Sequence, residues 1–402
     1  MDILVINSGS SSIKFQLINM HNKKVLCKGL LERIGIADGI FNYESHDGKD
    51  KIKETRDIPN HRVGIKMILD VIQDPKAGVI KSLDEIEGVG HRIVHGGEKI
   101  NTSVLLTEAN IKLIEECIPL APLHNPPNLM GVEAVKSELP NVPHVGVFDT
   151  AFHATMPEES YIYGLNYEYY EKHRIRRFGF HGTSHQYVAE KGADILGIPR
   201  DQFNCVTCHM GNGVSFTAVK NGKSFDTSLG YGTMCGIPMG TRAGDLDPAI
   251  LLHMLDNLKM STKDVHNQIY NNSGLKGMSG LSNDMRDVQK AAAEGNKRAE
   301  LALEVFAHAA KKYIGAFSTL MGGTLHAIIF TAGIGENDIA TRERICNGLE
   351  VLGARIDKKK NDIRGEEKIV STDDSRVKIM VIPTNEELMI ALETHRVAEE
   401  SH

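Results

Sequence analysis

Two stretches of the chain, at residues 3–18 and 204–219, repeat one pattern of hydrophobic and polar positions. Each has an apolar run, a short polar turn and a second apolar run, ILVINSGSSSIKFQLI and NCVTCHMGNGVSFTAV. Short apolar runs bounded by turn residues predict buried strands, so each stretch predicts a hairpin. Glycine permits a sharp turn whose N–H groups approach an anion, and Ser, Asn, His and Lys supply further donors. The pair therefore predicts two similar lobes that grip one polyphosphate.

The pattern outside the hairpins predicts strands that alternate with helices. The further strands are expected at residues 25–31, 86–94, 144–148, 327–331 and 377–382, and the helices at 62–72, 109–117, much of 247–315 and from 385 onward. The first half then reads βββαβαβ, and the second half begins the same order again. A repeated unit of this kind predicts an α/β fold of two duplicated βββαβαβ lobes, with the active site in the interlobe cleft.

Length and charge limit the organisation and the partners. A chain of 402 residues exceeds what one core usually organises, so we expect two domains, at residues 1–150 and 151–384, with a C-terminal helix at 385–402 that joins the first. The formal net charge is −6 and no long basic run occurs, which makes nucleic acid an unlikely partner. We expect the short basic cluster KHRIRR, residues 172–177, to be a solvated face.

The compartment follows from three further features. The N-terminal sequence MDILVINSGS lacks the basic region and long apolar run of a signal peptide, so we expect a cytoplasmic protein. Residues 313–335 contain no Asp, Glu, Lys or Arg, yet their glycines and His326 favour a helix, a turn and a strand over a membrane span. The six cysteines are scattered, which predicts reduced thiols. The stretch CVTCH matches a haem-attachment motif but lies in a predicted strand, so we expect no haem.

Three groups of residues are candidates for chemistry. In the first turn Asn7, Ser10, Ser11, Ser12 and Lys14 lie within reach of a phosphate or its metal ion. The segment FTAGIGEN, residues 330–337, takes a buried strand into a glycine turn and an expected helix, where a nucleotide can approach. Neither a Walker motif nor a dinucleotide fingerprint is present.

The third group is cationic. Arg92, His181 and Arg242 follow strand-like or glycine-rich segments, from which a side chain projects into a cleft. Donors of this type suit a phosphoryl group in transfer, whose oxygens carry the developing charge.

Ten ordered motifs together resemble the acetate kinase family. They are NSGSSSIK, GHRIVHGGE, PLAPLHNPPNL, VFDTAFH, RRFGFHGTSH, CHMGNGVS, MGTRAGDLDP, SNDMRD, FTAGIGEN and PTNEE, and they run from Met1 to about His395. The resemblance implies the actin, Hsp70 and sugar kinase superfamily, a hexokinase-like and ribonuclease H-like fold. It also implies ATP and ADP as co-substrates, acetate and acetyl phosphate as substrates, Mg²⁺ with Mn²⁺ as an alternative, and a homodimer formed through the second domain.

The resemblance also implies a role for each site residue. It places catalysis at Asp149, His181, Arg242 and Arg92; acyl substrate at Arg92, Val94, Leu123 and Phe180; metal at Asn7 and Glu387; and ATP at Lys14, Ser10, Ser12, His209, Met210, Gly211, Asn212, Gly213, Asp284, Met285, Arg286, Gly333, Ile334, Gly335, Glu336 and Asn337.

Two points qualify what the resemblance implies. A short carboxylic acid is already ionised at neutral pH, so Asp149 is expected to orient Mg²⁺ through water rather than to act as a base. The family usually has a segment like FTPLEGL before MGTR, whereas this chain reads YGTMCGIP, with Thr233 where a proline would wall the acyl pocket. Acetate is therefore the first expectation and propionate or butyrate the alternative. An ATP-gated binding module of the Hsp70 or actin kind would leave Arg92, His181 and Arg242 without a role.

Overall fold

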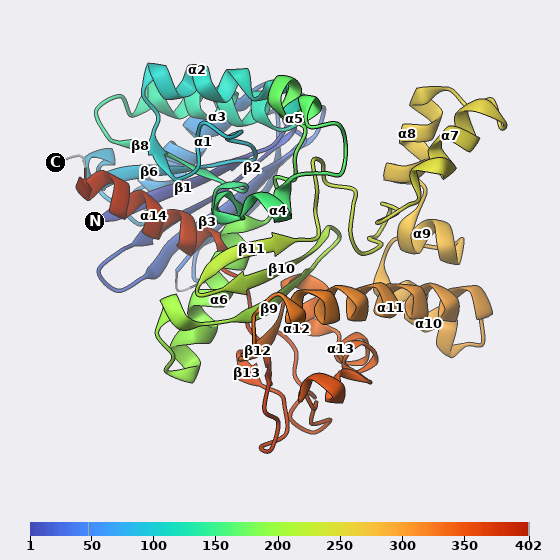
Figure 1. Ribbon diagram of the computed structural model, residues 1–402. Helices are drawn as coiled ribbons and strands as arrows, with labels where there is room; N and C mark the ends of the chain where they lie inside the picture. Colours follow the sequence, from blue (N-terminus) through green and yellow to red (C-terminus); the bar gives the residue numbers. More distant parts are fainter. Residues whose placement is uncertain (47, 401–402) are drawn as a thin grey trace. The chain divides into compact units, whose positions relative to one another are not determined.

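The computed structural model describes residues 1–46 and 48–400. The chain divides into two compact units, Met1–Ala154 with Asn385–His402, called here the first unit, and Thr155–Thr384, the second unit. Each unit contains one β-sheet flanked by helices (Figure 1). The helix expected at 385–402 is α14 (Glu386–Glu400), and the last two positions of that expectation lie outside the described residues.

The sheet of the first unit has eight strands in the order β5-β4-β3-β2-β1-β6-β8-β7. Their bounds are β1 Asp2–Ser8, β2 Ser12–Asn19, β3 Lys24–Glu32, β4 Gly39–Ser45, β5 Lys51–Arg56, β6 Ile86–Ile93, β7 Val104–Leu105 and β8 His144–Phe148. Strands β1 and β2 form the expected hairpin, and β1, β6 and β8 run parallel. The edge strands β5 and β7 and the adjacent strand β4 were not expected from the sequence.

The sheet of the second unit has six strands in the order β11-β10-β9-β12-β14-β13. Their bounds are β9 Cys205–Met210, β10 Val214–Lys220, β11 Lys223–Thr227, β12 Ala327–Thr331, β13 Lys368–Ile369 and β14 Lys378–Val381. Strands β9 and β10 form the second expected hairpin, and β9, β12 and β14 run parallel.

The two sheets share one inner topology. In both, three antiparallel strands are followed by two parallel ones, as β3-β2-β1-β6-β8 in the first unit and as β11-β10-β9-β12-β14 in the second. This common order confirms the predicted α/β fold of duplicated βββαβαβ units.

Alternating burial explains why the first hairpin reads as almost continuous apolar runs. Ile3 and Val5 of β1 belong to a core cluster with α14, whereas Leu4 and Ile6 belong to the cluster beneath α1 (His61–Ile72) and α3 (Asn125–Glu138). A strand with both faces covered has to be apolar at nearly every position. Gly90 on β6 allows α14 to approach, because a Cβ there would lie 2.4 Å from Thr394 Oγ1. The remaining helix of this unit is α2 (Glu108–Glu116).

Helices make up most of the second unit. They are α4 Glu158–Tyr161, α5 Glu168–His173, α6 Gly182–Leu196, α7 Pro248–Asp256, α8 Thr262–Asn271, α9 Gly274–Ser279, α10 Met285–Ala293, α11 Lys297–Thr319, α12 Ala332–Asn337 and α13 Ile339–Cys346. Helix α6 contacts β9 and β12, and α11 contacts β9 and β10. The uncharged segment 313–335 comprises the end of α11, a turn, β12 and the start of α12. Among the described residues, none of the helices has both the length and the apolar character needed to cross a membrane.

Candidate functional site

Polar side chains of the first unit gather at one end of its hairpin. Asn7 and Lys14 are cross-strand partners on β1 and β2, and the Lys14 ammonium forms an ion pair with Glu387 in the first turn of α14. Ser10 is exposed and Ser12 begins β2. The hairpin therefore presents an amide, an ammonium and hydroxyl groups around one carboxylate.

Arg92 and Asp149 form the central ion pair of this unit. Arg92 lies near the end of β6 and Asp149 directly follows β8, so the parallel pairing of these strands brings both to one edge of the sheet. Arg92 Nε donates to Asp149 Oδ1 at 3.1 Å, Nη2 pairs with Oδ2, and Nη1 lies 3.5 Å from Asn7 Oδ1. Two parallel N–H···O contacts fix the orientation of both groups.

The electrostatics identify one residue that the sequence analysis missed. Burial disfavours the Arg92 cation, but the negative charges of Asp149 and Glu386 outweigh burial and raise the pKa of Arg92. Burial raises the pKa of Glu386, which Arg92 counteracts. Glu386 directly precedes Glu387 in the motif PTNEE, so the signal was present in the sequence. Arg92 therefore lies near the carboxylates of Asp149, Glu386 and Glu387.

The predicted acyl-binding residues are divided between the units. Val94 is buried in the first unit, where its N–H donates to Asn128 Oδ1 at 3.0 Å. Leu123 belongs to the same unit, but its side chain is 76% exposed. A side chain this exposed encloses no pocket within the first unit, so the acyl-binding role of Leu123 stays a prediction. Phe180 belongs to the second unit and is buried.

His181, His209 and Arg242 come together in the second unit. His181 precedes α6 in a left-handed conformation with φ of 55°, and its ring stacks on that of His209 with centroids 4.1 Å apart. A Cβ on Gly213 would lie 3.0 Å from Arg242 Nη2 and 3.5 Å from His181 Nε2. The glycine of the β9–β10 turn therefore leaves room for a cation and an imidazole side by side.

Arg242 is held by a backbone carbonyl. Its Nη1 donates to the oxygen of Thr233 at 2.6 Å, so the residue at the unusual position of the 231–238 segment holds the guanidinium through its main chain. Burial lowers the pKa of Arg242, which the nearby Tyr270 partly offsets. Unlike Arg92, this arginine has no carboxylate among the hydrogen-bond and ion-pair partners that the structure describes for it.

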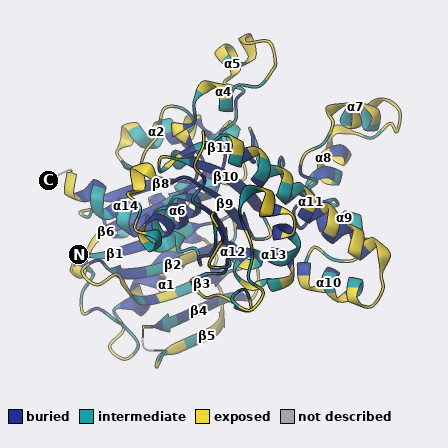
Figure 2. Ribbon diagram, turned by 60° about the horizontal axis from the view of Figure 1, so that its bottom comes forward, coloured by how far each residue is buried: buried dark blue, intermediate teal, exposed yellow. Residues whose placement is uncertain are grey.

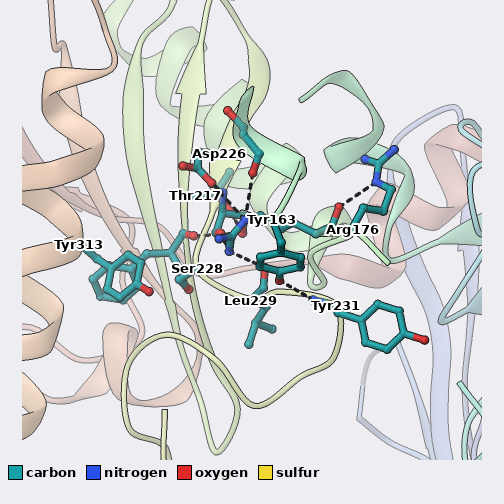
Figure 3. A network of polar contacts seen from close by, with 12 residues as sticks. Tyr163, Arg176, Thr217, Asp226, Ser228, Leu229, Tyr231 and Tyr313 are labelled. Atoms are coloured by element: carbon teal, nitrogen blue, oxygen red, sulfur yellow. Dashed lines mark hydrogen bonds and ion pairs between the residues drawn. The ribbon is translucent and has the colours of Figure 1, made fainter. Parts of the chain in front are cut away.

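The segment that carries Thr233 and Arg242 is anchored at several points. Tyr163 Oη accepts from the N–H of Tyr231 at 2.9 Å (Figure 3). Asp245 accepts from the N–H of Gly236 at 2.8 Å and from the Tyr313 hydroxyl of α11 at 2.5 Å. These contacts fix the loop that positions Arg242.

The same network corrects one expectation about residues 172–177. Arg177 Nη1 donates to the carbonyls of Thr227 and Leu229 at 2.7 and 3.3 Å, and Arg176 is buried with its guanidinium 3.6 Å from the ring centroid of Tyr161. The expected solvated face is thus wrong for the last two arginines. Arg177 is drawn inward by carbonyls at and beyond the end of β11, and Arg176 is covered by the ring of Tyr161 in α4.

A pocket of about 790 Å³ lies in the second unit. Its lining includes eight of the predicted nucleotide-binding residues: Gly211, Asn212, Asp284, Met285, Arg286, Gly333, Ile334 and Asn337. The apolar wall includes Leu275 and Phe306, and the rim includes Asn283, Gln289 and Arg364. A mostly apolar cavity with a few polar groups at its edge is typical of a small-molecule site.

Five predicted nucleotide residues of the second unit do not line this pocket: His209, Met210, Gly213, Gly335 and Glu336. Met210 is fully buried in β9. The Glu336 carboxylate accepts from the N–H groups of Ala332 and Thr384 at 2.8 and 3.0 Å, so it fastens the α12 turn to the end of the second unit. The sequence analysis also missed Arg342, whose buried guanidinium donates to the Gly335 carbonyl at 2.9 Å beneath this turn.

The sequence profile of the acetokinase family matches residues 2–392. The chain belongs to the acetokinase family. It is 55% identical over 400 residues to the acetate kinase of Caldanaerobacter subterraneus subsp. tengcongensis, covering 99% of both chains. It is also 55% identical over 394 residues to the acetate kinase of Alkaliphilus metalliredigens, covering 98% of this chain and 99% of the relative.

Solved structures agree with this membership of the acetokinase family. The Porphyromonas gingivalis acetate kinase matches with a TM-score of 0.94 at 44% identity, and a propionate kinase from Francisella tularensis matches with 0.90 at 41%; each comparison covers 98% of this chain and 99% of the other. The protein is therefore a phosphotransferase of the acetokinase family.

Proposed function

We propose that this protein is an acetate kinase that transfers the γ-phosphoryl group of ATP directly and reversibly to acetate. The observation that carries this proposal is the set of cations in a chain of the acetokinase family. Arg92 is fixed by Asp149 in the first unit, and Arg242 lies beside His181 in the second. The relatives that are 55% identical over almost their whole length are named acetate kinases.

The chemistry needs cations more than it needs a base. The acetate carboxylate is already ionised at neutral pH, so its oxygen can attack the γ-phosphorus while the bond from phosphorus to the ADP oxygen breaks. The barrier is the approach of one anion to another. We assign the acetate carboxylate to Arg92 and the phosphoryl oxygens to Arg242 and His181, groups whose positive charge and N–H donors offset that repulsion.

We assign the 790 Å³ pocket of the second unit to the nucleoside of ATP. Its apolar wall suits a purine, and Asn212 and the α12 turn at Gly333 supply polar groups at the rim. On this assignment Lys14, Ser10 and Ser12 of the first unit contact the phosphates. The proposed reaction requires both units to act on the same phosphoryl group.

The donor set of the first unit fits Mg²⁺. Asn7, Asp149 and Glu387 offer amide and carboxylate oxygens, the ligand type that Mg²⁺ prefers, and Mg²⁺ in kinases needs only one or two carboxylates besides phosphates and water. The described residues contain no group of three or more His, Cys, Asp or Glu side chains that could hold a metal alone. We therefore propose binding together with ATP, where the ion would neutralise phosphate charge, with Mn²⁺ as an alternative.

The decisive experiment measures acetate-dependent ADP formation. Hydroxylamine traps acetyl phosphate as a hydroxamate, so a kinase gives ADP and hydroxamate in equal amounts, both dependent on acetate. ATP hydrolysis that is independent of acetate would contradict the proposal and favour an ATP-gated binding module. Isolation of a phosphoenzyme that is competent in both half-reactions would contradict direct transfer.

Acetate is preferred over longer acids because the relatives at 55% identity carry that name, although a solved relative at 41% identity is a propionate kinase. One methylene in an apolar pocket changes discrimination by about 1–3 kcal/mol. We expect kcat/KM to fall from acetate to propionate to butyrate. A higher kcat/KM for propionate would contradict acetate as the preferred substrate.

We further propose a cytoplasmic homodimer formed through the helices of the second unit. Helix α7 has no buried residue (Figure 2) and exposes Ile250 and Leu252. Helix α11 exposes Leu301 and Val305 one turn apart. Exposed apolar groups on helices are typical of an interface. The variant Leu301→Glu should sediment as a monomer, whereas Val351→Glu, at an exposed apolar site outside these helices, should sediment like the wild type.

A further inference from the structure

A row of polar side chains runs across the interior of the second sheet. Thr207 and His209 alternate on β9 with Val206, Cys208 and Met210, and Ser215 and Thr217 alternate on β10 with Val214, Phe216 and Ala218. The register places Ser215 opposite His209 and Thr217 opposite Thr207. Because side chains alternate between the faces of a strand, these four polar residues share one face. Buried polar groups on this scale require partners.

Ser215, His185 and Thr207 form a continuous chain of polar contacts that ends at His181. His181 Nδ1 lies 2.8 Å from Ser215 Oγ, which lies 2.7 Å from His185 Nε2. His185 Nδ1 in turn lies 2.7 Å from Thr207 Oγ1. Ser215, His185 and Thr207 are all fully buried, so their polar atoms depend on one another rather than on solvent.

The single hydroxyl hydrogen of Ser215 links the two imidazoles. It can be donated to only one ring nitrogen, so the other ring must donate to the Ser215 oxygen. If Ser215 donates to His181 Nδ1, neutral His181 carries its proton on Nε2. His185 then donates from Nε2 to Ser215 and accepts at Nδ1 from the hydroxyl of Thr207, which is 2.7 Å away. The other acceptor near that hydroxyl, the Thr217 carbonyl, lies farther from it at 3.5 Å.

The Nε2 atom of His181 lies on the side where the proposed chemistry takes place. A Cβ on Gly213 would lie within 3.5 Å of both His181 Nε2 and Arg242 Nη2. A phosphoryl oxygen is an acceptor, so the arrangement with the proton on Nε2 is the one that can donate to it without charging the ring.

We propose that Ser215, His185 and Thr207 are positioning residues that hold neutral His181 with its proton on Nε2, directed at the transferring phosphoryl group. This rests on the proposed function, because the acceptor at Nε2 is the phosphoryl oxygen. None of the three needs to touch the substrate. They act through the orientation and the tautomer of one ring.

The kinetic test uses a double-mutant cycle. Ser215→Ala removes the hydroxyl that both rings share and should lower kcat by roughly 10- to 100-fold, with KM for ATP and acetate nearly unchanged. Ser215→Thr keeps the hydroxyl and should restore most of the activity. Thr207→Val should lower kcat less, and adding it to Ser215→Ala should cost nothing further, because the chain is already broken.

Thr227→Val is the matched control. Thr227 Oγ1 lies 2.9 Å from Thr217 Oγ1 and donates to the carbonyl of Phe216, so it belongs to the same buried polar region but not to the chain. Its kcat should stay near the wild-type value even if its melting temperature falls. Equal losses of kcat in Ser215→Ala and Thr227→Val, or independent losses from Thr207→Val and Ser215→Ala, would overturn the proposal in favour of a structural role.

A second measurement reads the ring directly. In protein labelled with ¹⁵N-histidine, the nitrogen resonances of His181, assigned with His181→Gln, should show an unprotonated Nδ1 and a protonated Nε2, and Ser215→Ala should change both. A proton on Nδ1 in the wild type would overturn the proposed relay whether or not the protein is active. A wild type with this ring signature but no acetate-dependent ADP formation would instead contradict the proposed function.

Discussion

The two hairpins occupy equivalent places in two sheets of the same topology, yet the groups around them interact differently. Around the first, charges pair with charges: Lys14 with Glu387 and Arg92 with Asp149. Around the second, imidazoles bind hydroxyls, as His181 binds Ser215, and Arg242 binds a backbone carbonyl. Two sheets of the same topology can therefore surround their hairpins with different kinds of polar contact.

Arg92 and Arg242 differ in how far nearby carboxylates already balance their positive charge. The charge of Arg92 is already balanced by Asp149 and Glu386, which raise its pKa. Arg242 is half-buried and has no carboxylate among its described partners, and burial lowers its pKa. An incoming phosphoryl anion would therefore gain more from Arg242 than from Arg92, whereas Arg92 is better suited to hold and orient.

The comparison predicts its largest effect at Arg242. Arg242→Lys removes the planar fork that reaches both the Thr233 carbonyl and the space beside His181, and a lysine cannot reproduce that geometry. By analogy with arginine fingers we expect kcat to fall by about 10³ to 10⁵, with little change in thermal stability. Steady-state kinetics and the melting temperature measure the two effects.

Arg355→Lys is the control for this variant. Arg355 lies in the same unit, where its Nη1 forms an exposed ion pair with Asp374 at 2.9 Å, so the change should be kinetically silent. If Arg242→Lys retained more than a tenth of the wild-type kcat, the uncompensated cation of the second unit would not be the main source of catalysis.

Asp149 should show the next largest effect, on stability as well as rate. Asp149→Asn removes the charge that balances Arg92 and leaves that mostly buried cation beside an amide. Breaking a buried ion pair costs roughly 3–5 kcal/mol, and a misplaced donor costs roughly 10²- to 10³-fold in kcat. Urea unfolding and kcat together measure this variant.

The double variant Arg92→Met with Asp149→Asn distinguishes the two contributions of this ion pair. Removal of both charges should recover part of the lost stability but none of the activity. Recovery of activity would show that Arg92 and Asp149 serve the fold of the first unit and have no part in the transfer.

Gly213 gives a smaller and more local effect. A Cβ added there would lie 3.0 Å from Arg242 Nη2 and 3.4 Å from His181 Cε1, so both side chains must shift by a few tenths of an ångström. We expect Gly213→Ala to lower kcat by roughly 10- to 100-fold. Gly164→Ala is the control, since a Cβ there would meet no atom within 4 Å. Similar losses in the two variants would contradict a steric role for Gly213.

The sequence predicted the inner strands well and the site unevenly. Both hairpins, β8 and β12 coincide with apolar runs in the sequence. A strand that is buried on both faces is apolar at nearly every position, so it is easy to recognise. The edge strand β5 was missed because it is almost fully exposed and has no apolar run. Arg176 and Arg177 were misjudged because only the fold brings the ring of Tyr161 to the first and carbonyls of a distant strand to the second.

The site residues followed from motifs, but their partners did not. Ser215 and His185 lie inside two quoted motifs, CHMGNGVS and GTSH, yet nothing in one sequence says that β10 and α6 bring them within 2.7 Å. The sequence analysis assigned a role to Glu387 and none to Glu386. The sequence alone does not show which of two adjacent carboxylates lies near Arg92.

The smallest predicted effect is a pH dependence that belongs to the first unit. His91 Nε2 on β6 lies 3.0 Å from His144 Nδ1. Because His144 Nε2 donates to the Leu139 carbonyl at 2.9 Å, neutral His144 accepts from His91, and burial lowers the pKa of both imidazoles. The equivalent strands β12 and β14 of the second unit carry only apolar side chains at their buried positions apart from Thr331. Because the unfolded histidines have a pKa of about 6.5 and the folded ones a lower value, the unfolded state binds more protons below that pH, so stability falls as pH decreases.

Each histidine can contribute a slope of up to about 1.4 kcal/mol per pH unit as the pH falls from about 6.5 toward the folded pKa. His91→Gln keeps a donor for His144 but cannot titrate, so its free energy of unfolding should fall less than that of the wild type between pH 7.5 and 5.5. Urea titrations at three pH values measure the slopes. Parallel slopes for the two proteins would show that the acid sensitivity arises elsewhere, and the two sheets would then differ at their hairpins but not in their parallel strands.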